Sequence, residues 1–141
     1  MSSKNKQIGI IGEQILIAEF IKHGINVLLP VGDNSPYDIV IELNGIFYKV
    51  QVKTTEHIKN GKMIFSTNKS NPYTKINKKY TSNEIDLFGF YCIENGYIGL
   101  MPVYNCTSKD TILRVDTPKN NQFEKIKMAS NYKFDNIINT L

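Results

Sequence analysis

The sequence predicts a mixed α/β domain in which a central β-sheet is flanked by helices. Three observations lead to this fold class. The chain has 141 residues with 41% hydrophobic side chains, its first segment has helical spacing of apolar residues, and several later segments alternate as strands do. A chain of this length is sufficient for one domain with its own core. We therefore expect residues 1–141 to form a single domain.

The stretch from Gln7 to His23 is expected to be an amphipathic first helix. Its apolar residues at positions 8, 11, 15 and 18 follow the one-face spacing of a helix. Gly24 then supplies the left-handed residue that commonly ends a helix. Glu13 falls on the more polar side of this helix, where a glutamate is ordinarily solvated.

Strands are predicted near residues 25–30, 37–43, 46–54 and 62–66, and again at 87–93, 97–102 and 111–115. A basic loop or helical excursion is expected at 67–83. The chain ends in a polar tail with an apolar cluster, which is a candidate interface and equally a candidate core helix. The cluster consists of Phe134, Ile137, Ile138 and Leu141.

The segments 37–43 and 46–54 form a hairpin whose turn contains Gly45. Alternation in the first strand puts Tyr37, Ile39 and Ile41 on one face, with Asp38 on the other. Asp38 lies at the beginning of that strand.

Alternation in the second strand puts Lys49, Gln51 and Lys53 on one face. A carboxylate from Asp38, an amide oxygen and an ammonium group can thus meet at one end of the hairpin, which indicates a metal-dependent phosphodiesterase site. The alternative is that these groups are solvated strand ends. The hairpin alone does not separate the two interpretations.

Four motifs, taken in order, resemble the PD-(D/E)XK nuclease superfamily, and more closely its small single-domain branch that includes a group I intron homing endonuclease. They are Gly12-Glu13, the segment 26–34, Pro36-Tyr37-Asp38 and Val50-Gln51-Val52-Lys53-Thr54. A looser likeness continues through residues 84–91 and 99–103, which look like later core strands, and through 113–115 with 118–120. The resemblance implies a restriction-endonuclease-like core.

The sequence departs from the family pattern at two positions. Tyr37 separates Pro36 from Asp38, and Gln51 stands where the second strand usually carries an acid. An amide oxygen can still coordinate Mg²⁺, which accepts several kinds of oxygen ligand. Glu13 can restore the missing charge, because a helix glutamate takes that role in many branches of the superfamily.

The resemblance implies a role for each site residue. Asp38 is the expected central metal ligand, and Glu13 is a second carboxylate that binds directly or through water. The Gln51 side chain and the Val52 carbonyl are expected neutral ligands. Lys53 would position or deprotonate the attacking water and offset phosphate charge. The expected cofactor is Mg²⁺, with Mn²⁺ as a substitute.

The formal net charge of +4 favours a polyanionic partner such as double-stranded DNA. The window from residue 57 to residue 83 contains no Asp or Glu, and we expect its lysines to contact the phosphate backbone. Codon bias toward lysine is the alternative explanation. Thr54 could also bind a phosphate oxygen, although a threonine at a strand end is ordinarily structural. The lysines are Lys59, Lys62, Lys69, Lys75, Lys78 and Lys79.

Cysteine usage and hydropathy restrict the protein class further. Cys92 and Cys106 have no metal-binding spacing, so we expect reduced thiols in a cytoplasmic protein. The sequence contains no apolar run of membrane length. His23, at a helix end, is expected to be a capping or surface residue.

The function expected from these features is Mg²⁺-dependent cleavage of DNA by a site-specific endonuclease of homing or restriction type. A Holliday-junction resolvase is one alternative, because it shares the fold. A nuclease-fold binding module that has lost cleavage is another, and Gln51 is its motivation. Double-strand cutting by so small a domain implies at least two copies, so we expect a dimer or tetramer.

Overall fold

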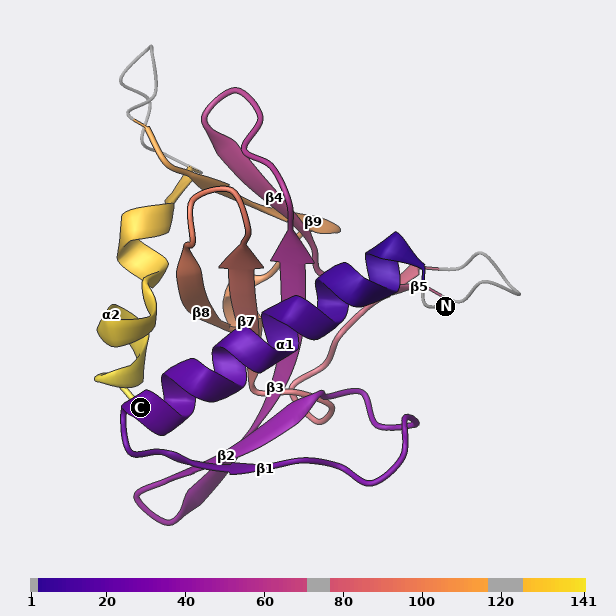
Figure 1. Cartoon of the computed structure of the whole chain (residues 1–141), viewed down its shortest axis with the longest axis vertical. Helices are drawn as coiled ribbons and strands as arrows, with labels where there is room; N and C mark the ends of the chain where they lie inside the picture. The colour runs from indigo at the N-terminus through magenta and orange to yellow at the C-terminus, as the bar shows by residue number, and fades with distance from the viewer. Residues whose placement is uncertain (1–2, 71–76, 117–125) are drawn as a thin grey trace.

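The computed structural model describes residues 3–70, 77–116 and 126–141. A mixed α/β fold is confirmed, with one long helix, several short strands and a short C-terminal helix (Figure 1). The main elements, in chain order, are α1 (Lys4–Lys22), β1 (Asn26–Leu28), β2 (Ile39–Leu43), β3 (Ile46–Thr55), β4 (Lys62–Ser66), β5 (Asn68–Ser70), β6 (Asn77–Lys79), β7 (Leu87–Cys92), β8 (Ile98–Pro102), β9 (Asp110–Arg114), β10 (Lys127–Met128) and α2 (Phe134–Ile138).

The central sheet has five strands in the order β1-β2-β3-β7-β8. Strands β3 and β7 are parallel, and the other neighbouring pairs are antiparallel, so the sheet is mixed as expected. A second sheet has the order β10-β9-β4, and β5 pairs with β6 in a separate hairpin. Helix α1 crosses one face of the central sheet, and α2 lies near β8 beside the C-terminal end of α1 (Figure 1).

Two apolar clusters fill the space on the two faces of the central sheet. On the α1 side, Leu16 and Phe20 of the helix pack with Val50 of β3. On the opposite side, Phe88 of β7 packs with Met63 of β4, among other buried side chains. Burying each such side chain is worth about 1.5–3 kcal/mol, so the two clusters stabilise the sheet from both faces.

The predicted buried face of the first helix is wrong. Ile11 is 44% exposed, whereas Gly12, Leu16 and Phe20 form the buried stripe. Gly12 sets this orientation, because a Cβ at that position would overlap the hydroxyl oxygen of Thr54 on β3. The helix therefore approaches the sheet most closely at Gly12. Glu13 is consequently partly buried, and does not lie on a solvated polar side.

The expected alternation of the first hairpin strand holds only from Ile39 onward. Ile39 and Ile41 lie in the α1-side cluster, but Tyr37 packs with the opposite cluster, so its predicted face is wrong. Strand β2 begins at Ile39, and residues that precede a strand are free of its pleat. Asp38 lies just before β2, where its backbone N–H donates a 2.9 Å hydrogen bond to the carbonyl of Val50.

The structure answers two questions that the sequence left open, one about the basic segment and one about the C-terminal apolar cluster. Part of the basic segment forms the β5–β6 hairpin, in which Lys69 is opposite Lys78, whereas a loop or helix was expected. In the C-terminal apolar cluster, Phe134 and Ile138 are buried in the α1-side core. The ring of Phe134 lies 5.0 Å from that of Phe20, so this cluster is a core helix.

Candidate active site

Two carboxyl groups meet where α1 passes the beginning of β2. The Glu13 side chain is hydrogen-bonded to Asp38, and burial, the Asp38 charge and this hydrogen bond together raise the pKa of Glu13 to about 7. Burial also raises the pKa of Asp38, although several neighbouring groups oppose that shift. A buried pair of like charges is unfavourable without a proton or a cation. The pair is therefore suited to bind a positive ion.

The β2–β3 hairpin fixes the orientation of Asp38. The backbone N–H of Val52 donates a 2.9 Å hydrogen bond to Asp38 Oδ2. This bond stabilises the charged carboxylate and so lowers the pKa of Asp38, against the effect of burial. Because the same strand carries Gln51 and Lys53, one hairpin places all of these groups relative to each other.

Gln51 and Lys53 lie on the face of β3 that points away from α1. Val50 and Val52 are buried on the α1 side, so alternation puts Gln51 and Lys53 on the other face. Both of these side chains are partly buried.

Burial and the acidic neighbour Asp38 have opposite effects on the pKa of Lys53. Burial lowers the pKa of Lys53, and the nearby Asp38 charge acts against this shift. Lys53 in turn lowers the pKa of Asp38. Of the four residues that the sequence predicted as catalytic, Asp38 thus lies near both Glu13 and Lys53, and Gln51 lies on the same face of β3 as Lys53.

Two surface grooves reach these groups. A groove of about 270 Å³ contains Glu13 and Asp38, and the segment between β1 and β2 supplies much of its opposite wall. A second groove, of about 440 Å³, is lined by Lys53 and by residues near the N-terminal end of α1. Both carboxylates are therefore accessible to a bound ligand from the first groove.

The predicted phosphate-binding lysines differ in their surroundings. Lys59, Lys78 and Lys79 are exposed, and Lys62 is partly buried on β4. Lys75 lies outside the described residues.

Lys69 and Thr54 both contact other residues of the protein. Lys69 forms an ion pair with Glu84, the residue directly after the acid-free window. This ion pair is the first cause of the lowered pKa of Glu84. The Thr54 hydroxyl is buried against Gly12 and has no hydrogen-bond partner among the described residues. Contact of Thr54 and Lys69 with DNA stays a prediction.

Tyr80, which the sequence places among the lysines of the basic segment, also contacts Lys53, and this contact was not predicted. Its ring centroid lies 5.5 Å from Lys53 Nζ and 5.7 Å from Lys69 Nζ. Burial, followed by the charges of Asp38 and Glu84, raises the pKa of Tyr80 to about 12. Tyr80 is separated from Lys53 by the whole of β4 and the β5–β6 hairpin, so no local spacing could have revealed the contact.

Asp86 supports the backbone of the β2–β3 hairpin. Its carboxylate accepts a 2.8 Å hydrogen bond from the Lys49 N–H, and its own N–H donates to the Lys49 carbonyl at 2.9 Å. Asp86 thus fastens the beginning of β7 to β3.

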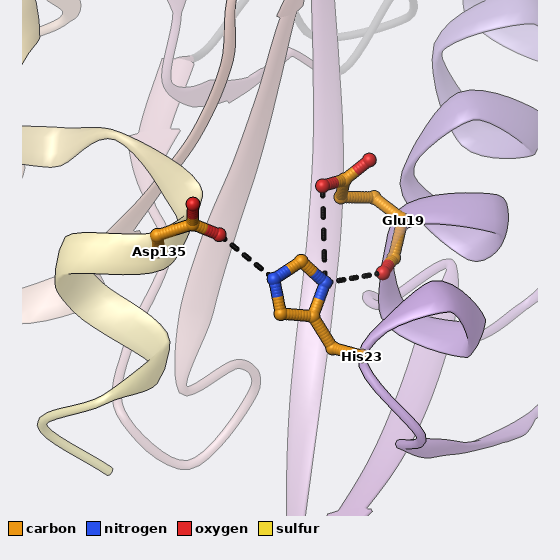
Figure 2. Close-up of side chains that lie close together, drawn as sticks. All are labelled: Glu19, His23 and Asp135. Atoms are coloured by element: carbon orange, nitrogen blue, oxygen red, sulfur yellow. Dashed lines mark hydrogen bonds and ion pairs between the residues drawn. The ribbon is translucent and has the colours of Figure 1, made fainter.

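A second polar cluster joins α1 to α2 and consists of Glu19, His23 and Asp135 (Figure 2). His23 Nδ1 lies 2.9 Å from the Glu19 carbonyl oxygen, and His23 Nε2 lies 2.8 Å from Asp135 Oδ1. A carbonyl and a carboxylate both accept, so these two contacts favour the imidazolium form of His23, in which both ring nitrogens donate. The hydrogen bond to the Glu19 carbonyl is the first cause of the raised pKa of His23.

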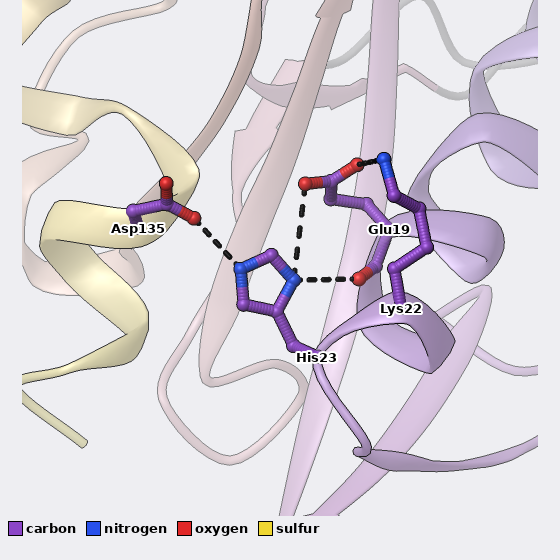
Figure 3. Close-up of polar contacts among 4 residues, drawn as sticks. All are labelled: Glu19, Lys22, His23 and Asp135. Atoms are coloured by element: carbon purple, nitrogen blue, oxygen red, sulfur yellow. Dashed lines mark hydrogen bonds and ion pairs between the residues drawn. The ribbon is translucent and has the colours of Figure 1, made fainter.

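We call Glu19, His23 and Asp135 the helix clamp, because their hydrogen bonds link α1 to α2. Figure 3 shows the Lys22 ammonium on the Glu19 carboxylate as well, at 3.5 Å. Glu19 and Asp135 lie on opposite sides of the imidazole ring in Figure 2, and each ring nitrogen has one of these two residues as its hydrogen-bond partner. Along the axis of α1, Glu13 lies about 9 Å from Glu19, at about 1.5 Å per residue. The expectation that His23 caps the helix is confirmed, since it is the C-cap of α1.

Within the described ranges, no helix is long and apolar enough to cross a membrane. No curated protein sequence matches the chain. The solved structure of a bacterial homing endonuclease, I-Ssp6803I, is similar to it, with a TM-score of 0.78 and 26% sequence identity over 96% of this chain and 93% of that one. A sequence model described as PD-(D/E)XK endonuclease matches residues 3–135. The chain therefore belongs to the PD-(D/E)XK endonuclease family.

Proposed function

We propose that this nuclease is a metal-dependent DNA endonuclease whose site is formed by Glu13, Asp38, Gln51 and Lys53. The observation that carries the proposal is that the carboxyl groups of Glu13 and Asp38 line one groove and interact strongly enough that the Asp38 charge helps to raise the pKa of Glu13. Such an arrangement is costly without a ligand, because burial and like charge both disfavour the ionised pair.

The donor set fits a hard divalent cation. Glu13 and Asp38 offer carboxylate oxygens, and we assign the Gln51 amide oxygen and the Val52 carbonyl as neutral ligands. Oxygen ligands of this kind suit Mg²⁺, with Mn²⁺ as a substitute. When bound, the cation would lower the pKa of a coordinated water and polarise the phosphate.

The residues of the chain orient and balance this site. The Val52 N–H holds Asp38 in one orientation, so its free oxygen can serve as a ligand without reorganisation. Lys53 positions or deprotonates the attacking water and offsets the charge that develops on the phosphate. Its lowered pKa makes the ammonium a better proton donor and the amine more accessible than in a solvated lysine.

DNA is the proposed substrate, contacted by Lys59, Lys78 and Lys79 on the exposed surface. We propose site-specific cleavage of homing or restriction type, which the similarity to a homing endonuclease supports. Cutting both strands requires two copies of the site, so the proposed active form is a dimer or tetramer.

A cleavage assay on linear duplex, a four-way junction and a single strand, each with and without Mg²⁺, tests the proposal. Metal-dependent cutting of duplex at a defined sequence is the expected result. Preference for the junction would identify a resolvase instead. DNA binding without cleavage in Mg²⁺ or Mn²⁺ would overturn the enzymatic proposal in favour of a binding module.

A further inference from the structure

The face of the Tyr80 ring is in contact with the proposed catalytic lysine. Lys53 Nζ lies 5.5 Å from the ring centroid, within the range of an attractive cation–π interaction. Among the described residues, the two cation–ring contacts both involve Tyr80, the second through Lys69 at 5.7 Å. Tyr80 thus lies between the catalytic strand β3 and the basic β5–β6 hairpin.

Lys53 is a side chain that needs such a contact. A lysine has many rotamers, and ordering it costs up to about 2 kcal/mol of conformational entropy. Asp38 attracts its ammonium group electrostatically, but a point charge attracts from any direction. An aromatic face adds a second, directional constraint, and the two together define where the ammonium group lies.

Tyr80 is itself held firmly enough to position another group. Its ring forms a T-shaped pair with that of Phe88, with 5.4 Å between the ring centroids and 88° between the ring planes, and Phe88 is fully buried on β7. Glu84 anchors the following turn, since it accepts hydrogen bonds from the Thr81 N–H at 3.1 Å and from its hydroxyl at 3.2 Å. Glu84 also pairs with Lys69, so the sheet and the β5–β6 hairpin both fix the ring.

We propose that Tyr80 is a positioning residue for catalysis: its ring face holds the Lys53 ammonium group in place on the side of β3 where the Asp38 charge acts on it. The inference rests on the proposed function, because it assumes that Lys53 acts in DNA cleavage. It assigns the work to the ring and not to the phenol hydroxyl, so phenylalanine should substitute for Tyr80.

The test compares Tyr80→Leu and Tyr80→Phe in the full chain. Tyr80→Leu keeps an apolar contact with Phe88 but removes the ring face, so kcat for DNA cleavage should fall between about 10-fold and about 100-fold. Affinity for the same duplex, measured with Ca²⁺ in place of Mg²⁺, should change less than about twofold. Tyr80→Phe should keep kcat within about twofold of wild type.

Tyr132→Leu is the matched control, because Tyr132 is also partly buried against the same apolar cluster. It should lower the melting temperature as much as Tyr80→Leu does while leaving kcat unchanged. If Tyr80→Leu does not fold, Tyr80→Met replaces it, since methionine fills the same space flexibly against Phe88.

Three results would overturn the inference: an unchanged kcat in the ring-less variants, an equal loss in Tyr80→Phe, or an equal loss in Tyr132→Leu. Each can be observed only if the wild-type protein cleaves DNA. A wild-type protein that does not cleave would instead contradict the proposed function, so the two failures are distinguishable.

Discussion

Gly12 and Thr54 are in direct contact, and this contact sets the distance between α1 and β3. A side chain at Gly12 would overlap the Thr54 hydroxyl, so the helix can approach the strand only because residue 12 has no Cβ. The close approach brings the next residue, Glu13, within hydrogen-bonding distance of Asp38. Helix packing and the assembly of the carboxyl pair thus depend on the same glycine.

Gly12→Ala should therefore destabilise the fold and separate the carboxyl pair. Overpacking of this kind costs about 1–3 kcal/mol, measured as the free energy of unfolding in denaturant. Gly9→Ala is the control, because a Cβ at Gly9 meets nothing within 4 Å. It should stabilise the same helix by about 0.5–1 kcal/mol. Equal effects of the two substitutions would contradict the contact as the cause.

The packing of α1 on the β2–β3 hairpin also shows what could and what could not be predicted from the sequence. The β2–β3 hairpin could be predicted because an alternation of period two and an Asn-Gly turn are local signals. The buried face of α1 could not, since Gly12 carries no apolar side chain and yet lies at the centre of the buried stripe. A count of apolar residues therefore selected the wrong face and put Glu13 in solvent.

The contacts of the candidate site also fall into those that could be predicted from the sequence and those that could not. Asp38, Gln51 and Lys53 share one hairpin, so their proximity could be predicted from register alone. The contact between Lys53 and Tyr80 depends on how the β5–β6 hairpin folds back, and a run rich in lysine gives no periodic signal for that. The counter-ion of Lys69, Glu84, likewise lies just beyond the window that defined the basic segment.

Asp38→Asn and Lys53→Ala should each abolish cleavage and leave DNA binding intact. The first removes the charge of the central ligand and the second removes the cation beside it, so each rate should fall by at least about a hundredfold. Single-turnover cleavage and a binding titration on the same duplex measure the two effects. Glu42→Gln, which neutralises a carboxylate on β2 itself, should have little effect. Near-wild-type cutting by Asp38→Asn or Lys53→Ala would mean that the site is wrongly assigned.

Gln51 tests whether the unusual neutral residue is a ligand. Gln51→Glu restores the acid that is common in the family, so it should keep metal binding and is expected to retain activity. Gln51→Ala removes the amide oxygen, so more Mg²⁺ should be needed for half-maximal cleavage. The comparison is a Mg²⁺ titration of the cleavage rate for the three proteins. An alanine variant that titrates like wild type would exclude Gln51 from the ligand set.

The pKa of Glu13 predicts how the stability of the metal-free protein depends on pH. Folding raises this pKa from 4.5 to about 7, so the folded state binds a proton more tightly than the unfolded chain. This contribution to stability is fully present below pH 4.5 and is lost as pH rises toward 7. Glu13→Gln should remove that part of the decline in melting temperature between those pH values.

Divalent cations should reverse this decline in the wild-type protein. Above pH 7, Mg²⁺ competes with no proton at Glu13, so its addition should raise the melting temperature most there and least near pH 5. His23 also has a raised pKa, but it lies in the helix clamp, so His23→Gln should shift the pH curve without changing the effect of Mg²⁺. A Mg²⁺ effect that is equal at pH 5 and pH 8 would contradict a site built on Glu13.

The exposed lysines of β6 should contribute to DNA affinity without contributing to sequence choice. Each phosphate contact that is lost reduces the slope of log K against log salt by about 0.9, so Lys78→Ala with Lys79→Ala should flatten it by about two units. Adding Lys75→Ala should bring the total to between about two and about three units. Binding should weaken equally on specific and unrelated duplexes, because phosphate contacts carry no base information. The control replaces Lys22 and Lys133 by alanine, which removes the same charge at the α1–α2 end of the molecule. An equal change of slope in this control would mean that only net charge matters.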